Sequence, residues 1–125
     1  MFERGVAEVD QEMTLGISAM NEGDLESSLA HFDKIVRRDP NFAEGWNKLA
    51  AVDYLLRDYN ASAHGTARTL RLESRHFGAL SGLGLVNMAL DRPVKALRSF
   101  RAALKIHPHM QGVRSNIKRL QKRLK

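Results

Sequence analysis

Three stretches of the sequence decide the fold, because they align when the chain is shifted by 34 residues: QEMTLGISAM at 11–20, GWNKLAAVDY at 45–54 and ALSGLGLVNM at 79–88. Each stretch has a leucine followed by a small residue, namely Leu15–Gly16, Leu49–Ala50 and Leu83–Gly84. The same shift, applied twice, aligns Phe32 with Phe100 and Pro40 with Pro108. A fixed period of this length predicts stacked structural repeats, each of which needs its neighbours to bury its apolar face.

These matches resemble the tetratricopeptide pattern, which is W-x2-L-G-x2-Y, then A-x3-F, then P. Trp46, Leu49 and Ala50 match its opening, whereas Ala96, Phe100 and Pro108 match its closing part. The resemblance implies an all-α fold, built as a right-handed superhelix of antiparallel helix hairpins. The sequence departs from the pattern at Glu12, at Ala19, Asp53 and Asn87 in place of tyrosine, and at Thr66 and Ser74 in the second repeat.

The repeat register predicts one domain, 1–125, with repeats at about 9–42, 43–76 and 77–110 and a capping helix at 111–125. Helices are expected at about 7–22, 25–38, 42–56, 59–72, 76–90, 93–106 and 110–124. The helix at 59–72 is expected to be the least stable of the interior helices, because it is rich in residues with poor helix propensity.

Helix starts can also be predicted from capping residues. Asp24 is expected to cap the helix at 25–38, and Asn41 with Glu44 resembles a capping box. Asp91, followed by Pro93 in the first turn, is expected to cap the helix at 93–106.

The resemblance also implies a binding surface, since the first helix of each tetratricopeptide hairpin lines a concave groove that receives an extended or helical peptide. The corresponding positions are Met13, Ile17, Met20, Asn21, Asn47, Ala51, Tyr54, Leu55, Ser81, Leu85 and Met88. Methionine adapts to irregular apolar ligands, and asparagine can bind a peptide backbone. The alternative is that Met20, Tyr54 and Met88 pack between repeats. A carboxylate clamp is not expected, because its positions hold Met13, Ile17, Lys48, Gly78 and Gly82.

The charge of +6 is unevenly distributed, with −6 over residues 1–62 and +12 over residues 63–125. Candidate residues for a basic surface are Arg68, Arg71, Arg75, Arg98, Arg101, Lys105, Lys118 and Lys122. Such asymmetry favours an acidic partner or salt-sensitive self-association, and it is equally compatible with a simply solvated surface. Nucleic acid is the less favoured partner, because 92–125 has a single aromatic residue, Phe100, and no stacking platform.

No catalytic, cofactor or metal site is expected. The chain has no cysteine, and His31, His64, His76, His107 and His109 lack metal-ligand spacing. No apolar run is long enough for a membrane helix, and no signal peptide is visible, so the sequence predicts no membrane insertion. The cytoplasm is the default compartment, with a bacterial periplasm or an organelle possible after removal of a targeting segment. The sequence therefore predicts a non-catalytic adaptor or assembly factor that binds a segment of another protein, with an acidic surface or nucleic acid on the basic half as the alternative.

Overall fold

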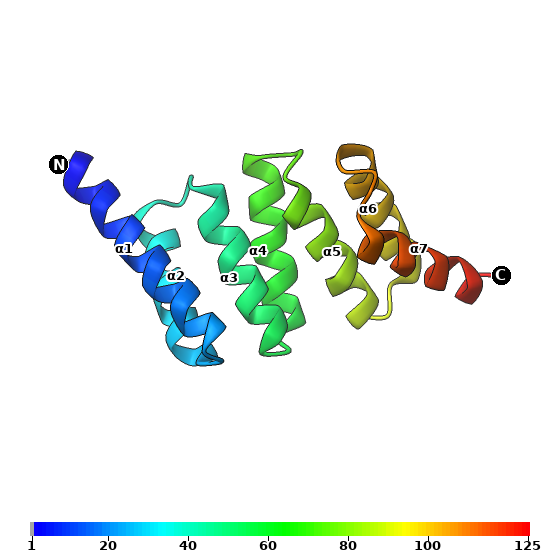
Figure 1. Ribbon diagram of the computed structural model, residues 1–125, viewed down its shortest axis with the longest axis horizontal. Coiled ribbons are helices and arrows are strands. Elements are labelled where there is room, and N and C mark those ends of the chain that lie inside the picture. Colours follow the sequence, from blue (N-terminus) through cyan, green and yellow to red (C-terminus); the bar gives the residue numbers. More distant parts are fainter. Residues whose placement is uncertain (1) are drawn as a thin grey trace.

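The computed structural model describes residues 2–125, with side chains from Gly5 onward, and these residues form α-helices and no strand. The helices are α1 (Phe2–Asn21), α2 (Leu25–Arg38), α3 (Ala43–Leu55), α4 (Tyr59–Leu72), α5 (Phe77–Ala89), α6 (Pro93–Ile106) and α7 (Gln111–Arg123). Figure 1 shows them arranged in sequence order from one end of the molecule to the other. The bounds agree with the expected helices to within one residue, except that α1 begins at Phe2.

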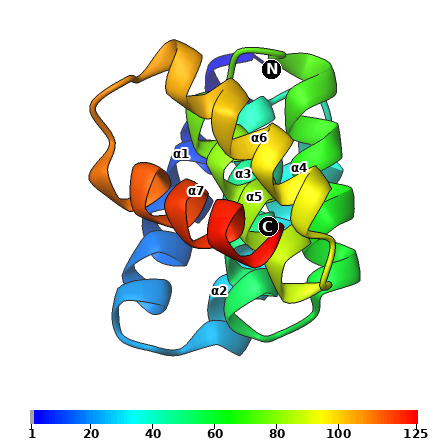
Figure 2. The ribbon, with the colours of Figure 1, turned by 90° about the vertical axis from the view of Figure 1, so that its right-hand side faces the viewer.

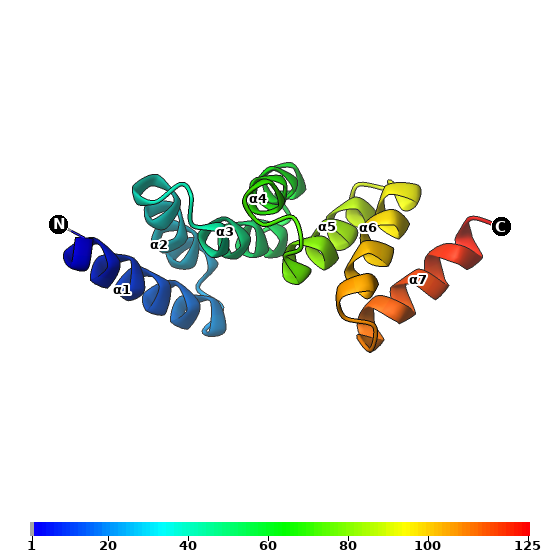
Figure 3. The same ribbon diagram turned by 90° about the horizontal axis from the view of Figure 1, so that it is seen from above.

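The helices pack as consecutive antiparallel hairpins. The main contacts within hairpins join α1 to α2, α3 to α4 and α5 to α6, while α2–α3, α4–α5 and α6–α7 contacts connect one hairpin to the next. Figure 2 looks along the stack with α7 in front, and Figure 3 shows α2 and α4 on one side of the row formed by α1, α3 and α5. Further contacts between α3 and α5 place the first helices of the second and third repeats side by side. This is the all-helical solenoid expected from the 34-residue period.

The core of the first and third repeats is organised around a phenyl ring that covers a glycine. Phe32 and Phe100 are completely buried. A Cβ built on Gly16 would lie 2.4 Å from the ring of Phe32, and a Cβ built on Gly84 would lie 2.4 Å from the ring of Phe100. Only glycine allows the ring to approach the partner helix this closely.

The second repeat is closed differently, because Ala50 and Thr66 occupy the positions of the glycine and the phenylalanine. Thr66 is buried, and its hydroxyl donates to the carbonyl of Ser62, 2.8 Å away within α4. The Ser62 hydroxyl donates to the carbonyl of Ala50 at 2.8 Å, and the Ser28 hydroxyl makes the equivalent bond to Gly16 in the first repeat at 2.8 Å. The hairpins therefore share one interhelical hydrogen bond in both repeats but differ in the side chain that fills the interior.

The turn inside each hairpin is repeated at Gly23, Arg57 and Asp91, all of which have positive φ angles, of 80°, 64° and 56°. After each of them, a backbone N–H bonds to a carbonyl five residues back, for example Asp58 to Asp53 at 2.9 Å. This is the Schellman arrangement that ends many helices.

Two of the three expected capping residues were wrong. Asp24 does cap α2, accepting a hydrogen bond from the backbone of Ser27 at 3.2 Å. Asp91 instead forms the left-handed turn, so Arg92 is the N-cap of α6 and gives no side-chain bond. Asn41 lies outside α3, whose N-cap is Phe42, also without a side-chain bond.

Candidate functional site

A pocket between α3 and α5 brings together five of the residues predicted to line the groove. Its volume is about 380 Å³. The predicted residues in its lining are Asn47, Ala51, Tyr54, Leu55 and Leu85. Sequence reasoning did not assign the other lining residues, which are Ala50, Ser62, Thr66, Gly78 and Gly82. Leu55 and Leu85 are 52% and 37% exposed, so the pocket has an apolar rim that solvent reaches.

The pocket exists because several large side chains are absent. Gly78 and Gly82 form part of the α5 wall, and a Cβ built on Gly82 would meet no atom within 4 Å. On the α4 side, Thr66 occupies the position at which the other repeats have a phenyl ring. Thr66 was visible in the sequence as a departure from the repeat pattern, but that departure alone does not reveal that Thr66 shares a cavity with Gly78 and Gly82.

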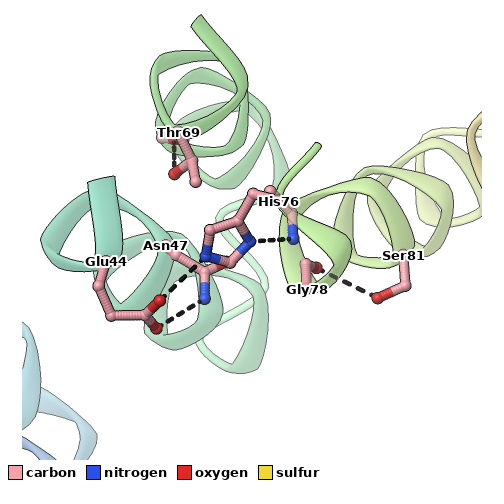
Figure 4. A network of polar contacts seen from close by, with 8 residues as sticks. Glu44, Asn47, Thr69, His76, Gly78 and Ser81 are labelled. Carbon is pink, nitrogen blue, oxygen red and sulfur yellow. Dashed lines mark hydrogen bonds and ion pairs between the residues drawn. The ribbon is translucent and has the colours of Figure 1, made fainter. Parts of the chain in front are cut away.

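A polar network connects α3 to α5 at the Asn47–Gly78 end of the pocket (Figure 4). The Nδ1 atom of His76 accepts a hydrogen bond from the backbone N–H of Ala79 at 3.0 Å and thereby caps α5. The Nε2–H of His76 then donates to the carboxylate of Glu44 at 2.9 Å, because a neutral imidazole has one donor and one acceptor. Asn47 donates to the same carboxylate at 3.0 Å. The imidazole is therefore a bridge between the second and third repeats.

The network also stabilises the charged form of Glu44. Burial by itself would raise the pKa of this carboxyl, but the hydrogen bonds from Asn47 and His76, with the charge of Lys48, hold the pKa below its usual value. Glu44 is thus ionised at neutral pH, and its carboxylate already accepts hydrogen bonds from Asn47 and His76. The side chain of Asn47, which lines the pocket, is therefore held in place before any ligand binds.

The remaining predicted groove residues lie elsewhere on the first helices. Met13, Ile17 and Met20 are partly buried and pack against the cluster of Phe32, Ile35 and Val52. Met88 packs against the cluster that contains Phe100. Asn21 is exposed at the end of α1, and the Ser81 hydroxyl bonds to the carbonyl of Gly78 at 3.2 Å within α5.

The residues predicted for the basic surface are spread over three helices and a loop. The Arg68 guanidinium lies 4.8 Å from the ring centre of Trp46, while Arg71 and Arg75 are exposed. A depression on α6, of about 430 Å³, is lined by Val94, Leu97, Arg98, Arg101, Ala102 and Lys105. Another on α7, of about 510 Å³, is lined by Lys118, Gln121, Lys122 and Lys125.

Ion pairing differs between the two ends of the molecule. In the N-terminal half, Glu8 pairs with Arg38, Asp33 pairs with Arg37 at 2.7 Å, and Glu12 contacts His31 at 2.6 Å. In the C-terminal half, Arg123 pairs with Asp91. Because residues 63–125 contain only two acidic side chains, most of their cations have no acidic residue of this half available to them.

The described residues also form a pocket outside the predicted groove. It has a volume of about 520 Å³, lies at the N-terminal end and is lined by Gly5, Val6, Val9, Asp10, Arg38, Asp39 and Phe42. Across residues 2–125, no three His, Asp or Glu side chains come together as a possible metal site. Within the same residues, no helix has the length and apolar character needed to cross a membrane.

Comparison with known proteins identifies the fold. No profile of a known protein family matches the chain. A TPR repeat-containing protein from Rhizobium etli is 25% identical over 122 residues, which cover 98% of this chain and 60% of that protein. The chain thus spans less than two thirds of this relative's length.

Solved structures of tetratricopeptide domains superimpose closely on the chain. The TPR domain of Arabidopsis OM64 aligns with a TM-score of 0.92 at 17% identity, over 95% of this chain and 98% of that one. The first TPR domain of Spaghetti (RPAP3), solved bound to the HSP90 peptide SRMEEVD, aligns with a TM-score of 0.88 at 14% identity, over 98% of this chain and 94% of that one. With the 34-residue period and the seven helices of the described residues, these findings show that the chain has the fold of a tetratricopeptide repeat solenoid, with about three repeats and a capping helix.

Proposed function

We propose that this chain is a non-catalytic interaction module, folded as one domain, that binds a segment of a partner protein in its concave groove. The observation that carries the proposal is the pocket between α3 and α5, because it is open, mainly apolar and lined by residues that the repeat register assigns to the groove. Sites of this kind, in which apolar walls surround a few fixed polar groups, are typical of ligand and peptide binding.

The comparisons support a protein partner in general terms. The structural neighbours include TPR domains solved with peptides of HSP90 and HSP70. We do not propose a carboxylate clamp as the binding mode, because four of its positions offer no polar side chain. Met13 and Ile17 pack against the core, and Gly78 and Gly82 have no side chain. Lys48 is the one charged residue among the five clamp positions.

The test is affinity capture from cells that produce the protein, with a groove variant whose fold should survive. Leu55→Glu/Leu85→Glu places charges on two exposed positions of the pocket rim and leaves the partly buried methionines intact. Asn60→Glu, at an exposed position of α4 outside the pocket lining, serves as a control. Partners that bind the groove should be lost from the rim variant alone. If a correctly folded rim variant captures the same proteins as the wild type, the groove is not the binding site.

An acidic surface or a nucleic acid on the basic half is the alternative function. It is favoured by the depression on α6, in which Arg98, Arg101 and Lys105 lie beside Val94, which is 56% exposed. Binding of this type should weaken steeply with salt, because neutralising phosphates releases counterions. Titration of single-stranded RNA in rising salt, with an Arg98→Glu/Arg101→Glu variant for comparison, distinguishes it from groove binding. Loss of RNA binding in that variant, with protein capture unchanged, would favour the alternative.

A further inference from the structure

The strongest feature beyond a general groove is the cavity that the second repeat opens beneath the concave surface. Its lining includes three buried residues, which are Ala50 of α3 and Ser62 and Thr66 of α4. The cavity therefore extends from the exposed rim into the interior of the hairpin. The repeat pattern has a large aromatic side chain at the position of Thr66.

The chemistry of the walls specifies the kind of side chain that fits. The α5 sequence FGALSGLGLVNMA contains no Asp, Glu, Lys or Arg. On α3, which forms the opposite wall, the nearby Glu44 is not part of the lining, and its carboxylate is already bonded to Asn47 and His76. The hydroxyls of Ser62 and Thr66 donate to backbone carbonyls within the hairpin. An uncharged lining whose buried hydroxyls already donate to backbone carbonyls favours a bulky apolar side chain, since a buried charge would have no partner there.

The volume is adequate for such a side chain. At about 380 Å³, the cavity lies in the range of roughly 300–1,000 Å³ that small-molecule sites occupy. The absence of a Cβ at Gly82 also leaves room for a peptide backbone to approach the α5 wall.

The next helix along the groove adds charge complementarity. Under the 34-residue shift, Arg119 and Lys122 of α7 occupy the positions that Leu85 and Met88 occupy in α5. Both cations are exposed, and α7 contains no acidic residue. By the repeat register, the concave face therefore passes from an uncharged cavity at α3 and α5 to cationic positions on α7.

From this juxtaposition we infer that the partner segment combines a bulky apolar anchor, best supplied by phenylalanine, with acidic residues a few positions away. The anchor enters the cavity between α3 and α5, and the acidic residues contact Arg119 and Lys122. This inference rests on the proposed groove function and specifies its ligand. A helix is about 10 Å across and an extended chain advances about 3.3 Å per residue, so the acidic residues should lie at least three or four positions from the anchor.

The probe is a short synthetic peptide, blocked at both ends, with one Phe and with Asp and Glu three and four positions to either side of it. Two matched peptides replace the Phe by Ala or all acidic residues by their amides. Affinity is measured by fluorescence anisotropy, and the contacted residues are identified by amide NMR shifts of the labelled protein. Blocking the peptide ends removes any contribution from a terminal carboxylate.

Two protein variants test the two halves of the site. Gly82→Leu fills the cavity, and Ala67→Leu adds a similar side chain at an exposed position of α4 that is outside the pocket lining. Arg119→Glu/Lys122→Glu reverses the α7 charges, and Arg98→Glu/Arg101→Glu reverses charges on α6 as its control.

The expected result is that Gly82→Leu weakens binding of the Phe peptide about tenfold or more, with little effect on the Ala peptide, while Ala67→Leu binds normally. The α7 reversal should weaken the acidic peptide by a similar factor and flatten its salt dependence, whereas the α6 reversal should not. Amide shifts should cluster at Gly78, Gly82 and Leu85.

The inference is overturned if the Phe peptide fails to bind at about millimolar concentration, or if it binds Gly82→Leu as well as the wild type. It is also overturned if the α6 reversal, and not the α7 reversal, abolishes binding. When these results coincide with loss of captured proteins in Leu55→Glu/Leu85→Glu, the groove is used but the anchor is wrong. When that rim variant also loses nothing, the proposed function fails as well.

Discussion

The first and third repeats are closed around a phenyl ring, whereas the second repeat is closed around an alanine methyl and two hydroxyls. Phe32 and Phe100 lie so close to Gly16 and Gly84 that no side chain fits at the glycines. In the second repeat, Ala50 and Thr66 replace such a pair, and both line the α3–α5 pocket. The difference teaches that the small residue and the ring form one packing unit, and that changing both members together can open a cavity without breaking the hairpin.

The largest expected effect is at the glycine of the third repeat. Gly84→Ala would place a methyl 2.4 Å from the ring of Phe100, which must move within a closed core. We expect the free energy of unfolding, measured by urea denaturation, to fall by about 1–3 kcal/mol despite the better helix propensity of alanine. An unchanged or increased stability would show that the ring can move aside, and that the two kinds of repeat differ less than their packing indicates.

A phenyl ring introduced into the second repeat tests whether the packing unit can be restored. Thr66→Phe alone should lower stability by about 1–3 kcal/mol, because the ring would meet the Cβ of Ala50 where the other repeats have glycine. In Ala50→Gly/Thr66→Phe the clash is removed. The free energy of unfolding of the double variant should therefore exceed the value expected from adding the two single effects by about 1–2 kcal/mol. Strict additivity in the double-mutant cycle would contradict the idea of a coupled pair.

The equivalent residues Asp53 and Asn87 give a pH-dependent difference between the second and third repeats. Burial, with the nearby carboxylates of Asp58 and Asp33, raises the pKa of Asp53 from 3.8 to about 6. The folded state thus retains a proton that the unfolded chain has released, so stability should fall as pH rises through this interval.

The matching substitution is Asp53→Asn, which copies the residue of the third repeat. We expect it to stabilise the protein by about 1 kcal/mol at neutral pH, since no charge is then buried, and to lose this advantage as the pH falls to about 4. Urea titrations of both proteins across this range measure the difference. A gain that is constant with pH would show that ionisation of Asp53 is not its cause.

The smallest expected effect is at Gly82, two residues from Gly84 on the same helix. A Cβ here meets no atom within 4 Å, so Gly82→Ala should raise the free energy of unfolding by about 0.5–1 kcal/mol. The free energies of unfolding of Gly82→Ala and Gly84→Ala should be compared under the same conditions, by thermal or urea denaturation. Two glycines of one helix should thus respond with opposite signs, and equal signs would contradict the distinction between a packed and an open glycine.

The regular features of the molecule could be predicted from the sequence because they depend on spacing. The 34-residue period predicted the helices and their hairpins, and Asp24 was correctly identified as a cap. The cap at Asp91 was wrong because this residue adopts the left-handed conformation of the turn, and its carboxylate pairs with Arg123. The expected partner of Asn41, Glu44, instead bonds to His76, the N-cap of α5.

The candidate site was only partly predictable, since a cavity is defined by missing atoms. The register predicts Tyr54, Leu55 and Leu85 on one surface, and these three residues line one pocket. The depth of that pocket depends on Thr66 of α4 and Gly82 of α5, which line it together. A pattern of single residues does not show which positions on different helices come together. Whether a methionine such as Met20 faces solvent or core likewise depends on the neighbouring helix, against which it is packed.

The nearest-neighbour contacts of the solenoid have a consequence for how the chain reaches its structure. Each helix packs mainly against the next one or two helices in sequence, so few contacts require distant segments to find each other. Low contact order predicts rapid folding, on the microsecond-to-millisecond timescale of helical proteins. Folding can begin at any hairpin and spread to its neighbours. The α1–α2 hairpin and α7, each of which packs against one neighbouring hairpin, should open most often once folding is complete.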